Sequence, residues 1–350
     1  MTVSLVTVCH RSSGVAGACF DSFRRELTTA GRSGEIVAVE QSEDVDEQAA
    51  IRSLGADRLL ERPNRGYAAG LNAGVAAATG DVLLLANPDL ELLPGSLAPL
   101  LDALDAGFDV VGPRIVWDHG GVLSYPPAED PDPVAEIRRI ARRRWQGAWE
   151  RGLESELETC WRAWTAHGPV EVPSLRGPLL VARRSTWDLL GPMDEGYFLY
   201  SEETEWLWRA RRSGARLGYV STAPVVHRGG HATERLPDRA DLEARSRERY
   251  FARNWPVVWR WVARALEPGD DRSGLVDADE VPDAAACRAE GADVWLLAPW
   301  RRLLPAGGCL GGGSLPDAAR AASAAGRWYA LAAARDRSGW RTLGRWTWTD

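Results

Sequence analysis

Two separate acidic groups in this sequence have side chains suited to transfer chemistry. The first is Asn87-Pro88-Asp89, which directly follows the apolar run from Val82 to Ala86. Pro88 lacks a backbone donor and ends strand pairing, so Asp89 is expected in an exposed turn. A hard divalent cation is usually held by one or two carboxylates together with substrate phosphates. Asp89 is therefore a candidate metal ligand, although an aspartate in this position more often caps the next turn.

The second group is Ser201-Glu202-Glu203-Thr204-Glu205, which is typical of the first turn of a helix with Ser201 as its N-cap. Acidic residues there complement the helix dipole, which is a purely structural role. The alternative role is catalytic. A carboxylate that the helix N-terminus keeps ionised can accept the proton of an attacking hydroxyl group. The aromatic segment just before it, Gly196 to Tyr200, suits stacking on the face of a sugar.

Two histidines follow a later apolar run, in the segment His227-Arg228-Gly229-Gly230-His231. The glycines favour a loop over a helix, which argues against a helical zinc pair. A lone histidine near a strand end is usually structural. The alternative is that one histidine joins Asp89 and phosphate oxygens in a divalent-cation site.

The elements that must position these residues alternate between strands and helices. Strands are predicted at 3–9, 35–40, 58–61 and 81–86, with helices at 20–27, 48–54, 67–78 and 97–104. This alternation predicts an α/β fold with a mostly parallel, right-handed sheet and helices on both faces. Ligands of such sheets bind beyond the carboxyl ends of the strands. Candidate site residues are therefore expected near 9–11, 40–44 and 87–89.

The second half of the chain predicts a less regular arrangement. Strands are expected at 170–172, 177–182 and 217–220, and helices at 185–190, 202–212 and 241–266. The main domain is thus predicted over 1–266, with a helical insert at about 133–165. An acidic linker is expected at 267–283, followed by a small β-rich domain at 284–350 that ends in a hairpin.

The helical insert carries five arginines between 138 and 144, together with four tryptophans. We expect a surface helix whose aromatic face packs on the core. The alternative is a contact for an anionic acceptor or a membrane surface.

Composition excludes several functions. The chain has no lysine, which rules out a Walker A phosphate loop and Schiff-base chemistry. A net charge of −7 argues against bulk nucleic-acid binding. The five cysteines are odd in number and form no C-x-x-C pair, so neither a disulfide framework nor a zinc ribbon fits. The N-terminus lacks signal-peptide features. A cytoplasmic location is expected, with the inner face of the membrane as the alternative.

The two acidic groups lie in segments that together resemble one family. The segment NRGYAAGLNAGVAAATGDVLLLANPDLEL resembles the donor-binding half of the family 2 inverting glycosyltransferases, which have a GT-A fold. Residues 177–230 are similar to the acceptor half of the rhamnosyltransferase-like branch. The resemblance covers roughly 3–235. It implies transfer from a dTDP- or UDP-sugar to a glycan, lipid-linked or small-molecule acceptor, assisted by Mg²⁺ or Mn²⁺, in cell-wall or polysaccharide biosynthesis.

The resemblance also implies roles for individual residues. Asp89 stands in the family's Asp-x-Asp motif as the metal ligand, and His227 matches a histidine that joins the metal or diphosphate site. Glu203 stands where the family has its catalytic aspartate, with Glu202 as the preceding acid. Asn87 and Glu203 both depart from the family's aspartates. The residues implied in binding the nucleotide sugar are Thr7, Cys9, Arg11, Glu40, Asn64, Gly66, Gly70, Asn72 and Asn87.

Two other functions compete with glycosyl transfer. A sugar nucleotidyltransferase would normally carry a glycine-rich signature after the first strand and use a lysine, and both are absent. A non-catalytic sugar-nucleotide binding protein of the same fold is kept open by the departures at Asn87 and Glu203.

Overall fold

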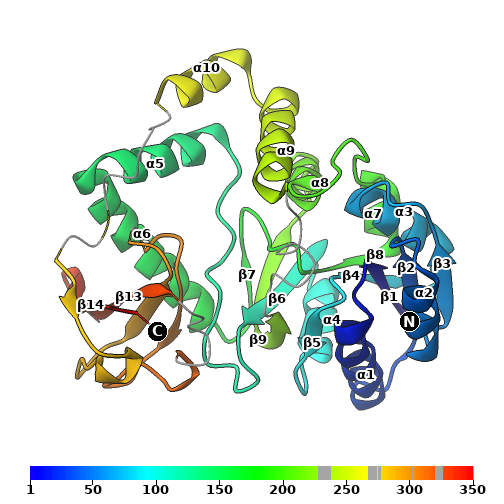
Figure 1. The fold of residues 1–350 in the computed structure, drawn as a ribbon, viewed down its shortest axis with the longest axis horizontal. Coiled ribbons are helices and arrows are strands. Elements are labelled where there is room, and N and C mark those ends of the chain that lie inside the picture. Colours follow the sequence, from blue (N-terminus) through cyan, green and yellow to red (C-terminus); the bar gives the residue numbers. More distant parts are fainter. Residues whose placement is uncertain (228–237, 267–273, 275–276, 302, 320–325, 350) are drawn as a thin grey trace. The chain divides into compact units, whose positions relative to one another are not determined.

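The computed structural model describes residues 1–350 apart from 228–237, 267–273, 275–276, 302, 320–325 and 350. The chain divides into two compact units (Figure 1). Unit 1 consists of residues 1–114, 128–131 and 167–256, and unit 2 consists of residues 115–127, 132–166 and 257–350. The helical insert at 133–165 was predicted within the main domain. In the structure it belongs to the same unit as the C-terminal strands.

Unit 1 is built on a mixed sheet with the strand order β3-β2-β1-β4-β8-β6-β9-β5, and β7 pairs with β9. The four strands β3, β2, β1 and β4 are parallel, and β8 runs antiparallel to β4. The predicted α/β class is confirmed. The strands are β1 (Thr2–Cys9), β2 (Ser33–Glu40), β3 (Arg58–Glu61), β4 (Val82–Ala86), β5 (Leu90–Leu92), β6 (Val110–Val116), β7 (Pro169–Glu171), β8 (Leu179–Arg183) and β9 (Leu217–His227).

The strand β4 shows why this sheet forms where it does. All five of its residues, from Val82 to Ala86, are apolar and buried, as expected for a strand covered on both faces. The helices of the unit are α1 (Ser13–Thr29), α2 (Val45–Ser53), α3 (Tyr67–Ala77), α4 (Leu97–Asp105), α7 (Arg184–Leu190), α8 (Glu202–Arg212) and α9 (Arg239–Asn254).

Helix α3 lies unusually close to the sheet because of two glycines. A Cβ atom at Gly74 would lie 2.4 Å from a methyl carbon of Val6, and one at Gly70 would lie 2.8 Å from both methyl carbons of Val8. Only glycine permits this approach of the helix backbone to β1. The close packing fixes the first residue of α3, Tyr67, at the carboxyl end of the parallel strands.

Unit 2 combines three helices with a second, five-stranded sheet of order β10-β14-β13-β11-β12. Its core gathers buried tryptophans, among them Trp295, Trp346 and Trp348. The predicted terminal hairpin is confirmed as the antiparallel pair β13–β14. The elements are α5 (Pro133–Arg144), α6 (Gln146–Trp164), α10 (Val257–Leu266), β10 (Asp279–Glu280), the short 3₁₀ turn η1 (Ala284–Ala286), β11 (Val294–Ala298), β12 (Gly307–Leu310), β13 (Arg327–Asp336) and β14 (Gly339–Thr349).

Two long predicted helices are each two helices in the structure. The segment 134–164 breaks at Trp145, which has an extended backbone and lies between α5 and α6. The segment 241–266 breaks at Trp255 and Pro256, because a residue before proline is biased toward extended conformations. The expected aromatic packing holds for Trp149 and Trp164, which are both buried.

The structure also bears on the cysteines, on the predicted linker and on the length and polarity of the helices. All five cysteines are free and buried. Most of the expected linker lies outside the described residues. Within the described residues, no helix is both long and apolar enough to cross a bilayer.

Candidate active site

Asp89 and His227 lie together at the end of the unit 1 sheet. Strand β4 ends just before Asn87, and Leu90 of β5 pairs with His227 of β9. This pairing brings residues 138 positions apart into contact. The Asp89 Oδ1 atom lies 3.2 Å from His227 Nε2, and the two side chains are only 9% and 14% exposed. The two residues expected at a metal site are therefore adjacent.

Asn87 connects this pair to helix α3. Its Nδ2 atom lies 3.3 Å from His227 Nε2, and its Oδ1 accepts a 2.8 Å hydrogen bond from the Tyr67 hydroxyl. The asparagine thus adds no charge, but both ends of its amide are engaged. An aspartate in this position would bring a second carboxylate next to Asp89.

The residues around Asp89 can hold a cation only with help from a substrate. Across the described ranges, no group of three or more His, Cys, Asp or Glu residues is arranged to hold a metal ion. Asp89 and His227 supply one carboxylate and one imidazole, which suits Mn²⁺ and, through the carboxylate, Mg²⁺. The donor set fits a cation that takes its remaining ligands from phosphate and water.

Glu202 and Glu203 open helix α8 after an unusual turn. Tyr200 and Ser201 both have left-handed backbones, with φ values of 70° and 66°. Two such residues in succession cost free energy unless the surroundings hold them, and such conformations cluster at functional sites. Ser201 occupies the N-cap position, but its side chain makes no capping hydrogen bond, so the expected serine cap is wrong.

Burial is the main influence on the pKa values of Glu202 and Glu203. Desolvation raises the pKa of Glu203, and the opposing backbone N–H groups of Glu203 and Thr204 do not offset it. Desolvation and then the charge of Glu203 raise the pKa of Glu202 still further above its ordinary value. Burial therefore opposes the ionisation that the helix N-terminus favours. Burial and mutual repulsion therefore disfavour two negative charges side by side at the start of α8.

The Oε2 atoms of Glu202 and Glu203 are both buried and have no hydrogen-bond partner within the described part of the chain. A buried acceptor without a partner is costly in free energy. Each is therefore available to a hydroxyl group that enters the site.

Tyr67 joins the two acidic groups. Its side chain is half-buried, and desolvation followed by the charges of Glu202, Glu203 and Asp89 raises the pKa of its hydroxyl well above the ordinary value. Both acidic groups therefore lie near one phenol. Sequence reasoning placed Tyr67 only at the start of the predicted helix 67–78, and no local pattern distinguishes it from a core residue.

A second connection runs through the start of β8. The Asn87 backbone N–H donates to the Pro178 carbonyl at 2.9 Å. The neighbouring Gly177 packs against Glu203, since a Cβ atom there would lie 2.8 Å from Glu203 Oε1. Asp89 and Glu203, 114 positions apart in the chain, therefore belong to one region of unit 1.

Thr7 and Glu40 are expected to bind nucleotide and lie at the carboxyl ends of β1 and β2. Both are fully buried, and neither Thr7 Oγ1 nor Glu40 Oε2 has a hydrogen-bond partner among the residues described. Glu40 Oε1 accepts from the Ser42 backbone N–H at 2.8 Å. Cys9 is buried, which raises the pKa of its thiol to about 12. Arg11 is exposed and has a left-handed backbone.

The other expected donor-binding residues contact protein in this structure. Asn64 Oδ1 accepts from the Gly66 N–H, and Gly70 packs against Val8. Asn72 holds the backbone of Met193 through both ends of its amide, at 2.9 and 3.0 Å. Gly66 has a φ of 98° and lies directly against the Phe198 carbonyl. These residues anchor the segment 191–200 to α3.

The aromatic segment before α8 is only partly available for stacking on a sugar. Tyr197 is fully buried, and the Arg249 guanidinium lies 5.2 Å from its ring centroid. Phe198 is 42% exposed. Of these two rings, Phe198 is the one that a ligand can reach. His231, the other candidate histidine, lies outside the described residues.

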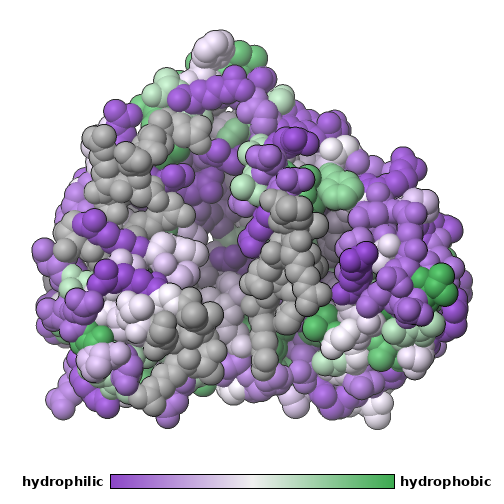
Figure 2. Space-filling model, viewed as in Figure 1, coloured by the Kyte–Doolittle hydropathy of each residue, from purple (hydrophilic) through white to green (hydrophobic). Residues whose placement is uncertain are grey.

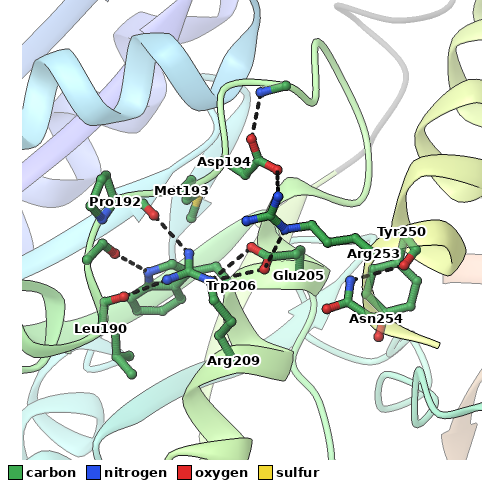
Figure 3. A network of polar contacts seen from close by, with 12 residues as sticks. Leu190, Pro192, Met193, Asp194, Glu205, Trp206, Arg209, Tyr250, Arg253 and Asn254 are labelled. Atoms are coloured by element: carbon green, nitrogen blue, oxygen red, sulfur yellow. Dashed lines mark hydrogen bonds and ion pairs between the residues drawn. The ribbon is translucent and has the colours of Figure 1, made fainter. Parts of the chain in front are cut away.

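A buried network of charges, which sequence reasoning missed, holds α8 in place (Figure 3). Glu205 is 1% exposed and accepts from Arg209 Nε at 3.0 Å. Arg209 in turn donates to the carbonyls of Leu190 and Pro192. The i, i+4 spacing of Glu205 and Arg209 is the only sequence signal that indicated this pair.

Helix α9 also holds the segment 191–200 in place. Asp194 accepts from Arg249 at 2.8 Å and lies 3.4 Å from Arg253, and Ser246 donates to the Leu199 carbonyl. The left-handed turn before Glu202 is thus fixed between α3 and α9.

Comparison with known proteins points to one enzyme family. The model of the family described as glycosyl transferase family 2 matches residues 4–167. The chain is 29% identical over 257 residues to an N-acetylglucosaminyl-diphospho-decaprenol L-rhamnosyltransferase from Mycobacterium tuberculosis, covering 65% of this chain and 79% of the relative. It is 24% identical over 196 residues to the low-salt glycan biosynthesis hexosyltransferase Agl10 from Haloferax volcanii, covering 55% and 58%.

Two solved structures are similar at lower identity. One is the mannosyltransferase PcManGT from Pyrobaculum calidifontis in complex with GDP-Man and Mn²⁺, with 17% identity, a TM-score of 0.47 and coverage of 75% of this chain and 68% of that one. The other is GalNAc-T7 with UDP, GalNAc and Mn²⁺, with 15% identity, a TM-score of 0.44 and coverage of 100% and 72%.

Proposed function

This chain is a member of glycosyl transferase family 2, and from that premise we propose that it is an inverting, metal-assisted enzyme with Glu203 as its general base. The observation that carries the proposal is the position of Tyr67. The phenol donates a hydrogen bond to Asn87, which lies beside Asp89. The charges of Glu202 and Glu203 also raise the pKa of the same phenol. A leaving diphosphate near Asp89 and an attacking hydroxyl near Glu203 would thus be neighbours.

The proposed reaction begins with a proton transfer. Glu203 Oε2 removes the proton from an acceptor hydroxyl group, and the oxygen attacks the anomeric carbon from the face opposite the diphosphate. The bond from the anomeric carbon to the diphosphate oxygen breaks, and its electron pair leaves with the nucleotide. The configuration at the anomeric carbon therefore inverts, and no covalent enzyme intermediate forms.

The other residues support this step. Burial and the charge of Glu203 raise the pKa of Glu202, which disfavours a second negative charge in the first turn of α8. Asp89 and His227 would hold Mg²⁺ or Mn²⁺, which when bound stabilises the negative charge of the leaving diphosphate. Thr7 and Glu40 would hold the nucleoside through their unpartnered oxygens.

We further propose a dTDP- or UDP-linked hexose or deoxyhexose as the donor and a lipid-linked glycan as the acceptor. The acceptor class is supported by the printed name of the mycobacterial relative, which is an N-acetylglucosaminyl-diphospho-decaprenol L-rhamnosyltransferase. A place in the synthesis of a cell-wall or surface polysaccharide follows from that class.

A panel assay tests the function. The purified chain is incubated with dTDP- and UDP-sugars, with Mn²⁺ or with EDTA, and release of nucleoside diphosphate is measured together with donor binding. We expect release that requires Mn²⁺ and increases with a lipid-linked acceptor. Tight donor binding with no turnover on any acceptor would instead indicate a non-catalytic sugar-nucleotide binding protein.

A further inference from the structure

We propose that α10, together with its packing partner α5, binds the surface of an anionic lipid bilayer. We call these two helices of unit 2 the basic–apolar face. The inference goes beyond glycosyl transfer, because it concerns a surface that carries none of the candidate active-site residues. It begins from two properties of these helices, an exposed apolar stripe and a concentration of arginines.

The apolar stripe lies on the outer side of α10. Val257, Val258 and Trp261 are 60%, 63% and 67% exposed, and their i, i+1, i+4 spacing places them on one side of the helix. On the opposite side Ala263 is buried, and α10 packs on α5. The inner side of α10 therefore contributes to the unit, whereas the outer side exposes large apolar groups to water.

This clustering is unusual for the chain. Within the described ranges, the other large exposed hydrophobic side chains do not gather three to a single helix. Single exposed apolar residues are ordinary, but a contiguous exposed patch marks an interaction site. Figure 2 shows hydrophobic atoms interleaved with hydrophilic ones over α10.

The positive charge of these helices indicates an anionic partner. Helices α5 and α10 contain seven arginines and one glutamate, although the chain as a whole has a net charge of −7. Arg138 and Arg144 are exposed, and the Arg144 guanidinium lies 5.4 Å from the ring centroid of the exposed Trp145. Basic residues beside an apolar face are attracted to anionic lipid headgroups.

The same features argue against two other partners, a second copy of this chain and a nucleic acid. A second copy docked face to face would bring the exposed Arg138, Arg144 and Arg264 of each copy together, and like charges repel. A nucleic acid would use the arginines but leave the valine and tryptophan side chains in water. A bilayer surface accommodates both, because tryptophan favours the interface and arginine favours the headgroups. A helix of ten residues is about 15 Å long, so α10 would lie in the membrane plane.

Vesicle co-sedimentation with the full chain tests the proposal. Two vesicle types are compared, phosphatidylcholine alone and an equal mixture of phosphatidylcholine and phosphatidylglycerol. We expect binding to the mixed vesicles that weakens with added salt, and little binding to phosphatidylcholine. No nucleotide sugar is present, so a failure here leaves the tests of Glu203 and Asp89 unaffected.

Two double variants and two matched controls locate the binding surface. Val258→Ser with Trp261→Ser should weaken binding at least about tenfold, since it removes the apolar contact. Arg138→Gln with Arg144→Gln should also weaken it about tenfold or more. The controls are Leu189→Ser, at a side chain 83% exposed on α7, and Arg32→Gln with Arg337→Gln; neither should change binding. Circular dichroism and thermal melting check that every variant is folded.

Three results would overturn the proposal. The first is no sedimentation of the folded wild-type chain with the mixed vesicles. The second is equal loss of binding in the Leu189→Ser control and in the Val258→Ser, Trp261→Ser variant. The third is a concentration-dependent dimer that this double variant abolishes, without any vesicle binding by the wild-type chain.

Discussion

The two acidic groups of the candidate site are built in opposite ways. Asp89 lies at the end of the sheet and has partners, since His227 contacts it and Asn87 contacts His227. Glu203 follows a left-handed turn, is half-buried, and has a buried oxygen with no partner among the described residues.

The difference matches two kinds of chemistry. A cation ligand needs a fixed, partnered geometry, because the binding energy depends on distances set in advance. A general base needs a carboxylate that gains by accepting a proton, and burial provides this by raising the pKa of Glu203. If the two groups have separate roles, altering one group should leave the property assigned to the other group unchanged.

The largest expected effect is that of Glu203→Gln. The amide cannot take the proton, so kcat should fall by about 10²–10⁴-fold. Donor affinity should change little, because the nucleotide sugar is assigned to the Asp89 group. Glu202→Gln is the matched control, with less than about a tenfold loss expected because Glu202 is not the assigned base. Equal losses of kcat in the two variants would contradict the assignment of Glu203 as the base.

Asp89→Ala should act on binding. The variant loses the carboxylate beside His227, and donor affinity measured by calorimetry in Mn²⁺ should fall by about 10–100-fold. In EDTA the wild-type and variant affinities should converge. If the variant binds donor normally in Mn²⁺, Asp89 does not hold the cation.

The pH profile tests the electrostatics of Glu203. Because burial raises its pKa above the ordinary value of 4.5, Glu203 is protonated and inactive as a base until the pH exceeds that raised value. In the donor-saturated enzyme, kcat should therefore rise with pH, with a midpoint above 4.5. A midpoint at or below 4.5 would mean that the carboxyl is not desolvated in the working enzyme.

The smallest expected effect concerns stability at Glu202. Its pKa is raised in the folded chain, so the folded state binds more protons than the unfolded state above about pH 4.5. Wild-type stability should therefore decrease as the pH rises from 4.5 through the folded-state pKa. Glu202→Gln removes this penalty and should melt higher than the wild type at neutral pH, with the difference vanishing near pH 4.5. A lower melting temperature at neutral pH would contradict this.

Much of the fold could be predicted from local patterns. The buried strand β4 and the terminal hairpin follow from apolar runs and turn residues, and both were found. The breaks at Trp145 and Trp255 were missed, although Pro256 was visible in the sequence as a helix-breaking residue.

Less of the site could be predicted. The contact of Asp89 with His227 depends on pairing between β5 and β9, and β5 was not predicted as a strand. Tyr67 joins the acidic groups only through tertiary packing, and desolvation at Glu203 opposes the effect expected from the helix terminus alone. A helix was predicted over 241–266, but only the structure separates the buried side of α10 from its exposed side.

The most direct test is a crystal structure of the Glu203→Gln variant with Mn²⁺ and an intact nucleotide sugar that it turns over slowly. The account predicts an anomalous manganese peak coordinated by Asp89 and the diphosphate. It also predicts that the residue 203 side chain faces the anomeric carbon from the opposite side. A manganese ion bound away from Asp89, or a sugar whose anomeric carbon residue 203 cannot reach, would contradict it.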